Sequence, residues 1–444
     1  MTINMKSTVK IIGAGLAGSE AALFLANKGI KVDLYEMKRI KKTPAQKLEN
    51  FGELVCSNSL KSTDDLTASG LLKKELELLG SSLLEIAKQT SVPAGSALAV
   101  DREKFASEIT KKLENNKNIT IHNEIVEEIN FDEPTIIATG PLTDEKLFNS
   151  LQKFIGNQNC YFYDAIAPIV AAESLDYDRI FTQNRYDKGE ENREGDYLNC
   201  SMNKEEYTLF YNELINATRA PLKDFEKVFE SCMPVEVMAK RGQDALRFGP
   251  MKPVGLYDEK RKEKPYAVLQ LRKENTQGTL YNLVGFQTNL TYPEQKRVFG
   301  LIPALKNAEF VRYGQMHRNS YINAPEVLNE FSALQKANNI FVAGQLSGVE
   351  GYMESIASGL YCAIQMLQLI NGKPQVALSE KTVLGAMMKY ISSTPITSFS
   401  PINSNFGIVY YDGDYIKDKK LKREKIKRDA LEEIIKFKEK LNGI

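Results

Sequence analysis

Residues 9–36, VKIIGAGLAGSEAALFLANKGIKVDLYE, constrain the fold more than any other stretch of this 444-residue chain. Val9–Ile12 is a short apolar run, typical of a buried parallel strand. Gly13, Gly15 and Gly18 follow at G-x-G-x-x-G spacing. The first glycine permits a tight turn, the second lets the backbone approach a pyrophosphate, and the third lets the next helix pack closely on the sheet. The pattern predicts a strand, a phosphate-binding turn and a helix.

The residues after the glycines predict that helix and a second strand. One helical face is apolar, formed by Ala21, Ala22, Leu25 and Ala26. Gly29 is expected to end the helix, and a strand is expected over Lys31–Tyr35. Glu36 then stands where an acid accepts hydrogen bonds from the ribose hydroxyls of a dinucleotide. We therefore expect a dinucleotide site, the alternative being a glycine-rich turn in another α/β unit. Its expected contacts are Gly13, Ala14, Gly15, Leu16, Ala17, Gly18 and Glu36.

Two later stretches indicate FAD rather than NAD as the bound dinucleotide. PTIIATG, residues 134–140, is a β-branched strand that ends in Ala-Thr-Gly. NIFVAGQLSGVEGYMESIASGLYCA, residues 339–363, repeats the order of strand, glycines and helix. This late segment resembles the glutathione-reductase-type flavoproteins, in which it lies along the flavin end of FAD. The additional cofactor contacts expected from these stretches are Thr139, Gly140, Gly344, Gln345 and Gly351.

A cofactor domain that begins and ends the chain implies an insertion between its two parts. We predict an α/β fold with a Rossmann-type, glutathione-reductase-like FAD-binding domain formed by residues 1–150 and 331–444. An α+β substrate domain is expected at 151–330, with strands at YAVLQLR and LYNLVGFQTNL and a helix at KEEYTLFYNELINA. That helix carries one apolar face, formed by Tyr207, Phe210, Tyr211 and Leu214. The cleft between the two domains is the expected active site.

Composition narrows the remaining possibilities. Five scattered cysteines, without a C-x-x-C pair, and two histidines predict neither a disulfide scaffold nor a metal site. The N-terminal residues contain no signal sequence, and no apolar run reaches the length of about 18 residues needed for a membrane span. A cytoplasmic protein is therefore expected. A net charge of +1 means that RNA would have to bind through local patches.

The C-terminal stretch, residues 417–444, predicts an amphipathic helix. Its apolar side consists of Ile426, Ala430, Ile434, Phe437 and Leu441. From Lys417 to Arg428, basic residues outnumber acidic ones by eight to two. A solvated helix face and a contact with RNA phosphates both account for this charge. RYDKGEENREGDY, residues 185–197, is expected to be a solvated loop.

Several longer motifs, in order along nearly the whole chain, resemble the folate- and FAD-dependent tRNA uracil-5-methyltransferases, the TrmFO family, which is related to GidA. The motifs are FGELVCSNSLKS, ASGLLKKEL, VPAGSALAVDREKF, FYDAIAPIV, DYLNC, ESCMPVEVMAKRGQDALRFGPMKPVGL, VGFQTNLTYPEQKRVF, VRYGQMHRNSYINAP and VAGQLSGVEGYMESIASG. One position departs from the family pattern. The family often carries histidine after Thr-Pro-Ala, whereas here Gln46 and Lys47 follow.

The resemblance implies a specific reaction. A one-carbon unit from 5,10-methylenetetrahydrofolate would be reduced with electrons from NADPH or NADH and placed on carbon 5 of a tRNA uracil, in the T-loop, giving 5-methyluridine. Three alternatives stay open. The same chemistry could act on large-subunit ribosomal RNA, the protein could be a plain FAD/NAD(P)H oxidoreductase, or it could be a non-catalytic RNA-binding flavoprotein.

The resemblance also implies two catalytic cysteines. Uracil carbon 5 becomes nucleophilic when a thiolate adds to carbon 6, and Cys232 in ESCMPVE is the implied nucleophile. Cys56 in LVCSNS is implied to lie beside the flavin and to assist transfer or proton removal. From the residues alone, a buried structural cysteine is the alternative for Cys232. Glu230 and Glu236 would disfavour a thiolate if they lie close to the sulfur, whereas Lys240, Arg241 and Arg247 would favour one.

Four further residues are candidates for binding substrate. Arg241, Arg247 and Lys252 flank the turn RFGPMKP and could meet folate carboxylates or RNA phosphates. Ordinary surface charge is the alternative for these three. His317 in MHRNSY is either a structural histidine or a residue near the uracil.

Overall fold

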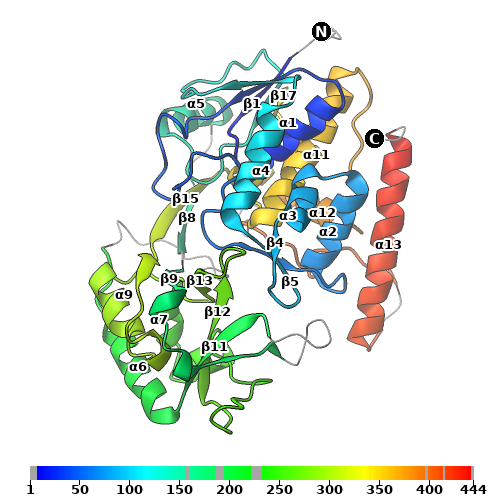
Figure 1. Ribbon diagram of the computed structural model, residues 1–444. Coiled ribbons are helices and arrows are strands. Elements are labelled where there is room, and N and C mark those ends of the chain that lie inside the picture. Colours follow the sequence, from blue (N-terminus) through cyan, green and yellow to red (C-terminus); the bar gives the residue numbers. More distant parts are fainter. Residues whose placement is uncertain are drawn as a thin grey trace.

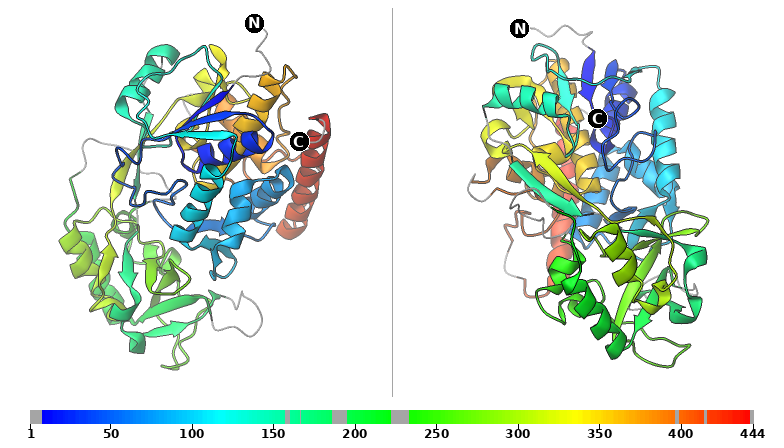
Figure 2. Two further views of the ribbon diagram at one scale, coloured as in Figure 1. Left: turned by 45° about the horizontal axis from the view of Figure 1, so that its top comes forward. Right: turned by 90° about the vertical axis from the view of Figure 1, so that its left-hand side faces the viewer.

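The computed structural model describes residues 8–156, 160–165, 167–185, 195–221, 233–395, 399–413 and 416–441. Figure 1 shows two lobes joined by a pair of strands. The first lobe combines the N-terminal third of the chain with its C-terminal third, and the second lobe is formed by the middle of the chain. The two further views in Figure 2 show the same separation.

The first lobe is built on a six-stranded sheet of order β16-β17-β7-β1-β2-β6. Five of these strands are parallel, and β16 pairs with β17 in the antiparallel sense. The strands are β1 (Val9–Ile12), β2 (Val32–Tyr35), β6 (Ile119–His122), β7 (Thr135–Ile137), β16 (Ala333–Leu334) and β17 (Ala337–Val342). The strands expected around residues 9–12, 31–35, 134–140 and 340–343 are therefore confirmed.

Two helices from opposite ends of the chain pack together on this sheet, α1 (Leu16–Asn27) and α11 (Tyr352–Ile370). A Cβ atom at Gly18 would lie 1.8 Å from the carbonyl oxygen of Gly13, and one at Gly359 would lie 2.2 Å from that of Ala17. Only glycine permits these approaches. Helix α1 ends as expected, with Gly29 at φ +81°. The sequence predicted one apolar face for α1, but the helix is buried on all sides, since every residue from Leu16 to Ala26 is buried.

Further helices and a small sheet complete the first lobe. The helices are α2 (Ala68–Leu79), α3 (Ser82–Gln89), α4 (Arg102–Glu114), α5 (Glu145–Ile155), α10 (Ala324–Val327), η6 (Gly344–Ser347), α12 (Val383–Ser393) and α13 (Lys419–Lys440). The small antiparallel sheet has the order β3-β5-β4, with β3 (Ser59–Ser62), β4 (Ser91–Val92) and β5 (Ala97–Val100). Helix α13 stands on the outer edge of the lobe beside α2 (Figure 1).

The second lobe contains a six-stranded antiparallel sheet of order β10-β11-β12-β13-β9-β14. Its strands are β9 (Ile169–Ala171), β10 (Ile180–Thr182), β11 (Tyr197–Met202), β12 (Ala267–Lys273), β13 (Leu280–Leu283) and β14 (Phe310–Arg312). Its helices are η1 (Ala172–Ser174), η2 (Tyr177–Arg179), α6 (Lys204–Asn216), α7 (Val235–Ala239), α8 (Ala245–Phe248), α9 (Tyr292–Phe299) and η5 (Pro303–Leu305). Strands β8 (Cys160–Ala165) and β15 (Met316–Tyr321) pair between the lobes (Figure 1).

Each lobe has its own hydrophobic core. The first core draws on residues 9–155 and 322–441, and the second on residues 170–308. The expected strand at YAVLQLR and the expected helix at KEEYTLFYNELINA are present as β12 and α6. Of LYNLVGFQTNL, only Leu280–Leu283 forms a strand, β13, and the prediction was too long at its C-terminal end. The predicted apolar side of α13 is buried throughout. Of the expected loop at residues 185–197, residues 186–194 lie outside the described part of the chain.

Within the residues that the structure describes, no helix combines the length and the apolar character needed to cross a membrane.

The buried carboxyl group of Glu75 is expected to make the stability of the protein depend on pH. Glu75 of α2 accepts hydrogen bonds from the backbone N–H groups of Val383 and Leu384 at the start of α12, at 2.7 and 2.9 Å. Burial raises the pKa of Glu75 from 4.5 to about 8. The unfolded chain ionises this group above pH 4.5 whereas the folded chain keeps the proton. Its contribution to stability is therefore complete below pH 4.5 and is lost as pH rises towards 8.

We expect Glu75→Gln to flatten the fall in unfolding free energy between pH 5.5 and 8, by up to about 1.4 kcal/mol per pH unit. Urea unfolding at several pH values measures this slope. Glu103→Gln, at an exposed position on α4, is the control and should keep the wild-type slope. An unchanged slope for Glu75→Gln would mean that Glu75 is ionised in the folded protein.

Candidate functional site

A cleft of about 1050 Å³ lies beyond the carboxyl ends of β1, β2 and β7. Strand β1 is the point at which the sheet order reverses, and ligands of open parallel sheets bind at this position. We call it the glycine-loop cleft. Most of the predicted cofactor contacts line it, namely Gly13, Gly15, Leu16, Ala17, Glu36, Thr139, Gly140, Gly344 and Gln345.

The glycines of the loop have different surroundings. Gly13 has φ +101°, and a Cβ atom there would lie 2.5 Å from the carbonyl oxygen of Ala138. At Gly15 a Cβ atom would meet nothing within 4 Å, so this glycine borders open space in the cleft. Gly18 is covered by Gly13, and Gly351 is the N-cap residue of α11 beside the cleft. Gly13 and Gly18 thus serve the packing of the chain, whereas the packing does not require a glycine at position 15.

Glu36 is held by the glycine loop itself. Its Oε2 accepts a hydrogen bond from the backbone N–H of Ala14 at 2.7 Å, and its Oε1 accepts one from the N–H of Lys38 at 2.8 Å. The residue is buried but borders the cleft. Each carboxylate oxygen has more than one acceptor position, so Glu36 can still accept hydrogen bonds from a ligand.

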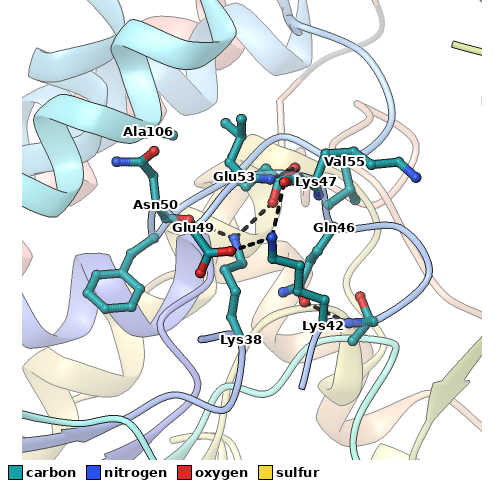
Figure 3. Close-up of polar contacts among 12 residues, drawn as sticks. Lys38, Lys42, Gln46, Lys47, Glu49, Asn50, Glu53, Val55 and Ala106 are labelled. Carbon is teal, nitrogen blue, oxygen red and sulfur yellow. Dashed lines mark hydrogen bonds and ion pairs between the residues drawn. The ribbon is translucent and has the colours of Figure 1, made fainter. Parts of the chain in front are cut away.

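Residues 42–55 form one wall of the cleft and are organised by a buried ion pair (Figure 3). The Lys38 Nζ lies 2.9 Å from Glu53 Oε2, and both side chains are 3% exposed. Glu53 Oε1 also accepts hydrogen bonds from the N–H groups of Lys47 and Leu48. Gln46, at the position that departs from the family pattern, lines the cleft and accepts a hydrogen bond from the Thr43 N–H at 2.9 Å.

Cys56 directly follows this wall and is partly exposed. The Tyr352 hydroxyl accepts hydrogen bonds from the backbone N–H groups of Cys56, at 2.6 Å, and of Ser57, at 3.2 Å. Tyr352 itself lines the cleft at the start of α11. Burial raises the pKa of Tyr352 far above its ordinary value, so the hydroxyl keeps its proton. The backbone around Cys56 is therefore fixed against the cleft.

Two arginines hold the carbonyl groups of the same turn. Arg102 of α4 donates to the carbonyl oxygen of Leu54 at 2.8 Å and to that of Cys56 at 3.4 Å, and Arg312 of β14 donates to that of Val55. Arg102 also forms an ion pair of 2.8 Å with Glu274, whose side chain is 4% exposed. Arg312 and Glu274 belong to the second lobe, so both lobes hold the Cys56 turn.

Asn58 extends this connection. Its amide nitrogen donates to the carbonyl oxygens of Val100, in the first lobe, and Lys273, in the second lobe. Its Oδ1 accepts a hydrogen bond from Arg272 at 2.8 Å. Asn58 is fully buried, so these bonds are shielded from water. The stretch that carries Cys56 is thus a second connection between the lobes, besides the strand pair β8 and β15, and we call it the joint.

A second cleft, of about 1020 Å³, borders both lobes at this joint, and we call it the inter-lobe cleft. It shares Glu53 with the glycine-loop cleft. Charged side chains of both signs line it, four basic (Lys47, Arg102, Lys104 and Arg312) and four acidic (Glu53, Asp101, Glu103 and Glu274).

The other predicted site residues lie elsewhere. Cys232 lies outside the described residues. Arg247 is bound within the second lobe, donating to the Tyr266 carbonyl oxygen at 3.0 Å and pairing with Asp244 at 2.6 Å. Arg241 is exposed and Lys252 is partly buried, and neither of them lines the described part of either cleft. His317 lies on β15 opposite Asp164 of β8.

Two other cysteines are buried in the cores, Cys200 and Cys362. Burial raises the pKa of both thiols, that of Cys362 to about 12, which makes them unreactive near neutral pH. Over the described ranges of the chain, no three His, Cys, Asp or Glu residues come together as metal ligands would.

Sequence reasoning missed the residues that fix Cys56, namely Arg102, Glu274, Arg312 and Tyr352. Two of them carried a usable signal. Arg102 stands just beyond the apolar strand Ala97–Val100, and Tyr352 follows Gly351, which was predicted. Glu274 and Arg312 come from the second lobe, and no local pattern links them to Cys56.

Comparison with known proteins identifies close relatives along the whole chain. The methylenetetrahydrofolate–tRNA-(uracil-5-)-methyltransferase TrmFO of Bacillus licheniformis is 51% identical over 432 residues, which covers 97% of this chain and 98% of that protein. The protein of the same name from Fusobacterium nucleatum is 50% identical over 430 residues, covering 96% of this chain and 98% of that protein.

Solved structures and a family model agree with these relatives. A structure of Aquifex aeolicus GidA matches with a TM-score of 0.67 at 14% identity, covering 96% of this chain and 76% of that chain. This likeness shows a shared α/β fold. The family model GIDA, described as glucose inhibited division protein A, matches residues 8–374. The chain therefore belongs to the TrmFO family, which is related to GidA.

Proposed function

We propose that this protein transfers the one-carbon unit of 5,10-methylenetetrahydrofolate to carbon 5 of a tRNA uracil, with FAD as cofactor and NADPH or NADH as reductant. The product would be 5-methyluridine, and the target a T-loop uridine. The observation that carries the proposal is the identity of about half, over nearly the full length, to proteins named for this reaction. The cytoplasm, where tRNA is modified, is the proposed location.

The residues of the glycine-loop cleft fit FAD. Gly15 leaves space for a pyrophosphate, and Glu36 has free acceptor positions for a ribose. Thr139, Gly344 and Gln345 would hold the flavin end. When bound, FAD carries the two electrons that convert a methylene unit into a methyl group. We further propose a discontinuous, glutathione-reductase-like cofactor domain of residues 1–150 and 331–444, with a substrate domain of residues 151–330.

Cys232 is the proposed nucleophile. Its thiolate would add to uracil carbon 6, and the electrons of the carbon 5–carbon 6 double bond would move into an enolate. Carbon 5 would then attack the one-carbon unit and lose its proton to a base. The bond to the folate nitrogen would break and release tetrahydrofolate, two electrons from NADPH or NADH would reduce the remaining methylene group to methyl, and the thiolate would be expelled. The target base has to leave the RNA stack for this reaction.

Cys56 is proposed to assist this reaction beside the flavin. Its backbone N–H is held by Tyr352 and its carbonyl oxygen by Arg102, so its position next to the cleft wall is fixed. Arg102 and Arg312 both donate to carbonyl oxygens of this turn. These contacts support a role in transfer or in removing the carbon 5 proton.

The proposed substrate contacts fall in the second lobe and at the joint between the lobes. We propose that Arg241, Arg247 and Lys252 meet RNA phosphates or folate carboxylates, and that His317 lies near the uracil.

We expect the protein to incorporate label from methylene-labelled methylenetetrahydrofolate into unmodified tRNA when FAD and NADPH are present. Large-subunit ribosomal RNA fragments serve as the parallel substrate. Cys232→Ala should lower the rate at least 1000-fold, because carbon 5 is then no longer activated, and Cys56→Ala at least tenfold. Label on ribosomal RNA alone would identify ribosomal RNA as the substrate. NADPH oxidation without label on either RNA would indicate a plain oxidoreductase.

The two glycines of the loop should respond differently to substitution. Gly15→Val places its Cβ atom in open space, so it should keep the wild-type melting temperature of the FAD-free protein but lower FAD affinity at least tenfold, as followed by flavin fluorescence. Gly18→Ala places a Cβ atom against the Gly13 carbonyl and should lower the melting temperature itself. Retention of FAD by Gly15→Val would show that the pyrophosphate does not bind beside Gly15.

Tyr352→Phe removes the acceptor of two backbone N–H groups and should loosen the Cys56 turn. We expect methyl transfer to fall at least tenfold while bound FAD stays near wild type. Tyr361→Phe, on the same helix, is the matched control, because its hydroxyl donates to the Glu330 carbonyl away from the cleft. Equal effects of the two variants on transfer would show that only general stability is lost.

A further inference from the structure

The first turns of α13 carry a dense and largely unpaired positive charge. Among the described residues, Lys427 pairs with Asp65 at 2.7 Å and Arg428 with Asp429 at 3.5 Å. The other basic side chains of this stretch form no ion pair with described residues, and they are Lys417, Lys419, Lys420, Lys422, Arg423 and Lys425. Their charge is therefore not neutralised by a described carboxylate.

The stability of the helix does not explain this charge. The helix begins at Lys419, and Asp418 caps it by accepting hydrogen bonds from two N–H groups, but its first turn contains no acidic residue. Cations at a helix N-terminus oppose the helix dipole, at a cost of roughly 0.3–1 kcal/mol each at low salt. The basic residues thus occupy the less favourable end of α13.

The packing of α13 turns these cations outward. Its apolar side, which includes Ile426, Ala430 and Ile434, is buried in the core of the first lobe beside α2. Lys419, Lys422 and Arg423 are exposed. Figures 1 and 2 show α13 on the outside of the lobe. A membrane-bound amphipathic helix would instead present its apolar side outward.

Aromatic rings lie among the cations. Lys422 and Lys425 stand over the ring of Tyr411, with Nζ 5.0 and 4.9 Å from its centroid. Arg423 stands 5.7 Å from the ring centroid of Phe406, and the neighbouring Tyr410 is 51% exposed. Basic residues interleaved with aromatic rings are typical of surfaces that bind RNA phosphates and stack on unpaired bases.

The same surface is connected to the catalytic end of α11. The backbone N–H and the hydroxyl of Ser404 donate to Glu354, at 3.1 and 2.6 Å. Glu354 lies two residues after Tyr352 and pairs with Lys61 at 2.7 Å. Lys61 lies on β3, just beyond the Cys56 turn, and its side chain is 40% exposed. Residues 404–406 thus connect the basic surface to the residues around Cys56.

We propose that the first three turns of α13, together with residues 406–411, form a docking surface for the backbone and unpaired bases of the tRNA substrate. The proposal rests on the function proposed above, because that function supplies the RNA. The surface holds RNA away from the reacting uracil and contributes affinity that depends on salt rather than on sequence.

The test combines four substitutions to glutamine at Lys419, Lys420, Lys422 and Arg423. The matched control neutralises four exposed lysines away from α13 that likewise form no ion pair with described residues, namely Lys117, Lys153, Lys306 and Lys373. Affinity for unmodified tRNA is measured between 50 and 200 mM salt, with FAD content and melting temperature as checks on folding. Vesicles containing phosphatidylserine are the second ligand.

We expect the docking variant to bind tRNA at least tenfold more weakly than the control variant, with a salt slope lower by up to about four. Its KM for tRNA should rise while kcat stays within about twofold. Equal tRNA affinities and equal salt slopes in the two variants would contradict the proposed docking surface. A loss of vesicle binding without a loss of tRNA binding would contradict it too. Absence of methyl transfer by the wild-type protein overturns the proposed function alone, since the comparison of tRNA affinities still decides the surface.

Discussion

The hydrogen bonds of the Cys56 turn are the constraint on which the arrangement of the two lobes depends. Arg102 and Arg312 bind its carbonyl groups, and Tyr352 binds its N–H groups. These three side chains come from α4, β14 and α11, so the turn is fixed only when both lobes are in place. The support of this turn is therefore shared between two lobes with separate hydrophobic cores.

Much of the first lobe could be predicted from its sequence, because strong local rules act there. The strand, glycine turn and helix at residues 9–27 follow from backbone sterics, and the glycines that these sterics require occur at a spacing that can be recognised in the sequence. The apolar side of α13 was equally clear, because its residues repeat with the helical period. The assignment to the family, from ordered motifs, is confirmed by the relatives.

The support of Cys56 could not be predicted in the same way. Arg312 and Glu274 act on this turn from the second lobe, and the contacts depend on how two cores meet. Glu36 was expected to face a ribose, whereas in the structure the N–H groups of Ala14 and Lys38 also hold it. Sequence patterns report the nearest neighbours along an element and carry no record of such tertiary partners.

The packing of α1 on α11 has a consequence for folding. These helices lie more than 300 residues apart in the chain, yet Gly359 packs directly on Ala17. During synthesis, α1 and its sheet strands emerge long before the helix that covers them, whereas the second lobe is contiguous and can complete its core first. The glycine-loop cleft is therefore among the last parts of the molecule to form, and its apolar walls depend on rapid closure by the C-terminal third.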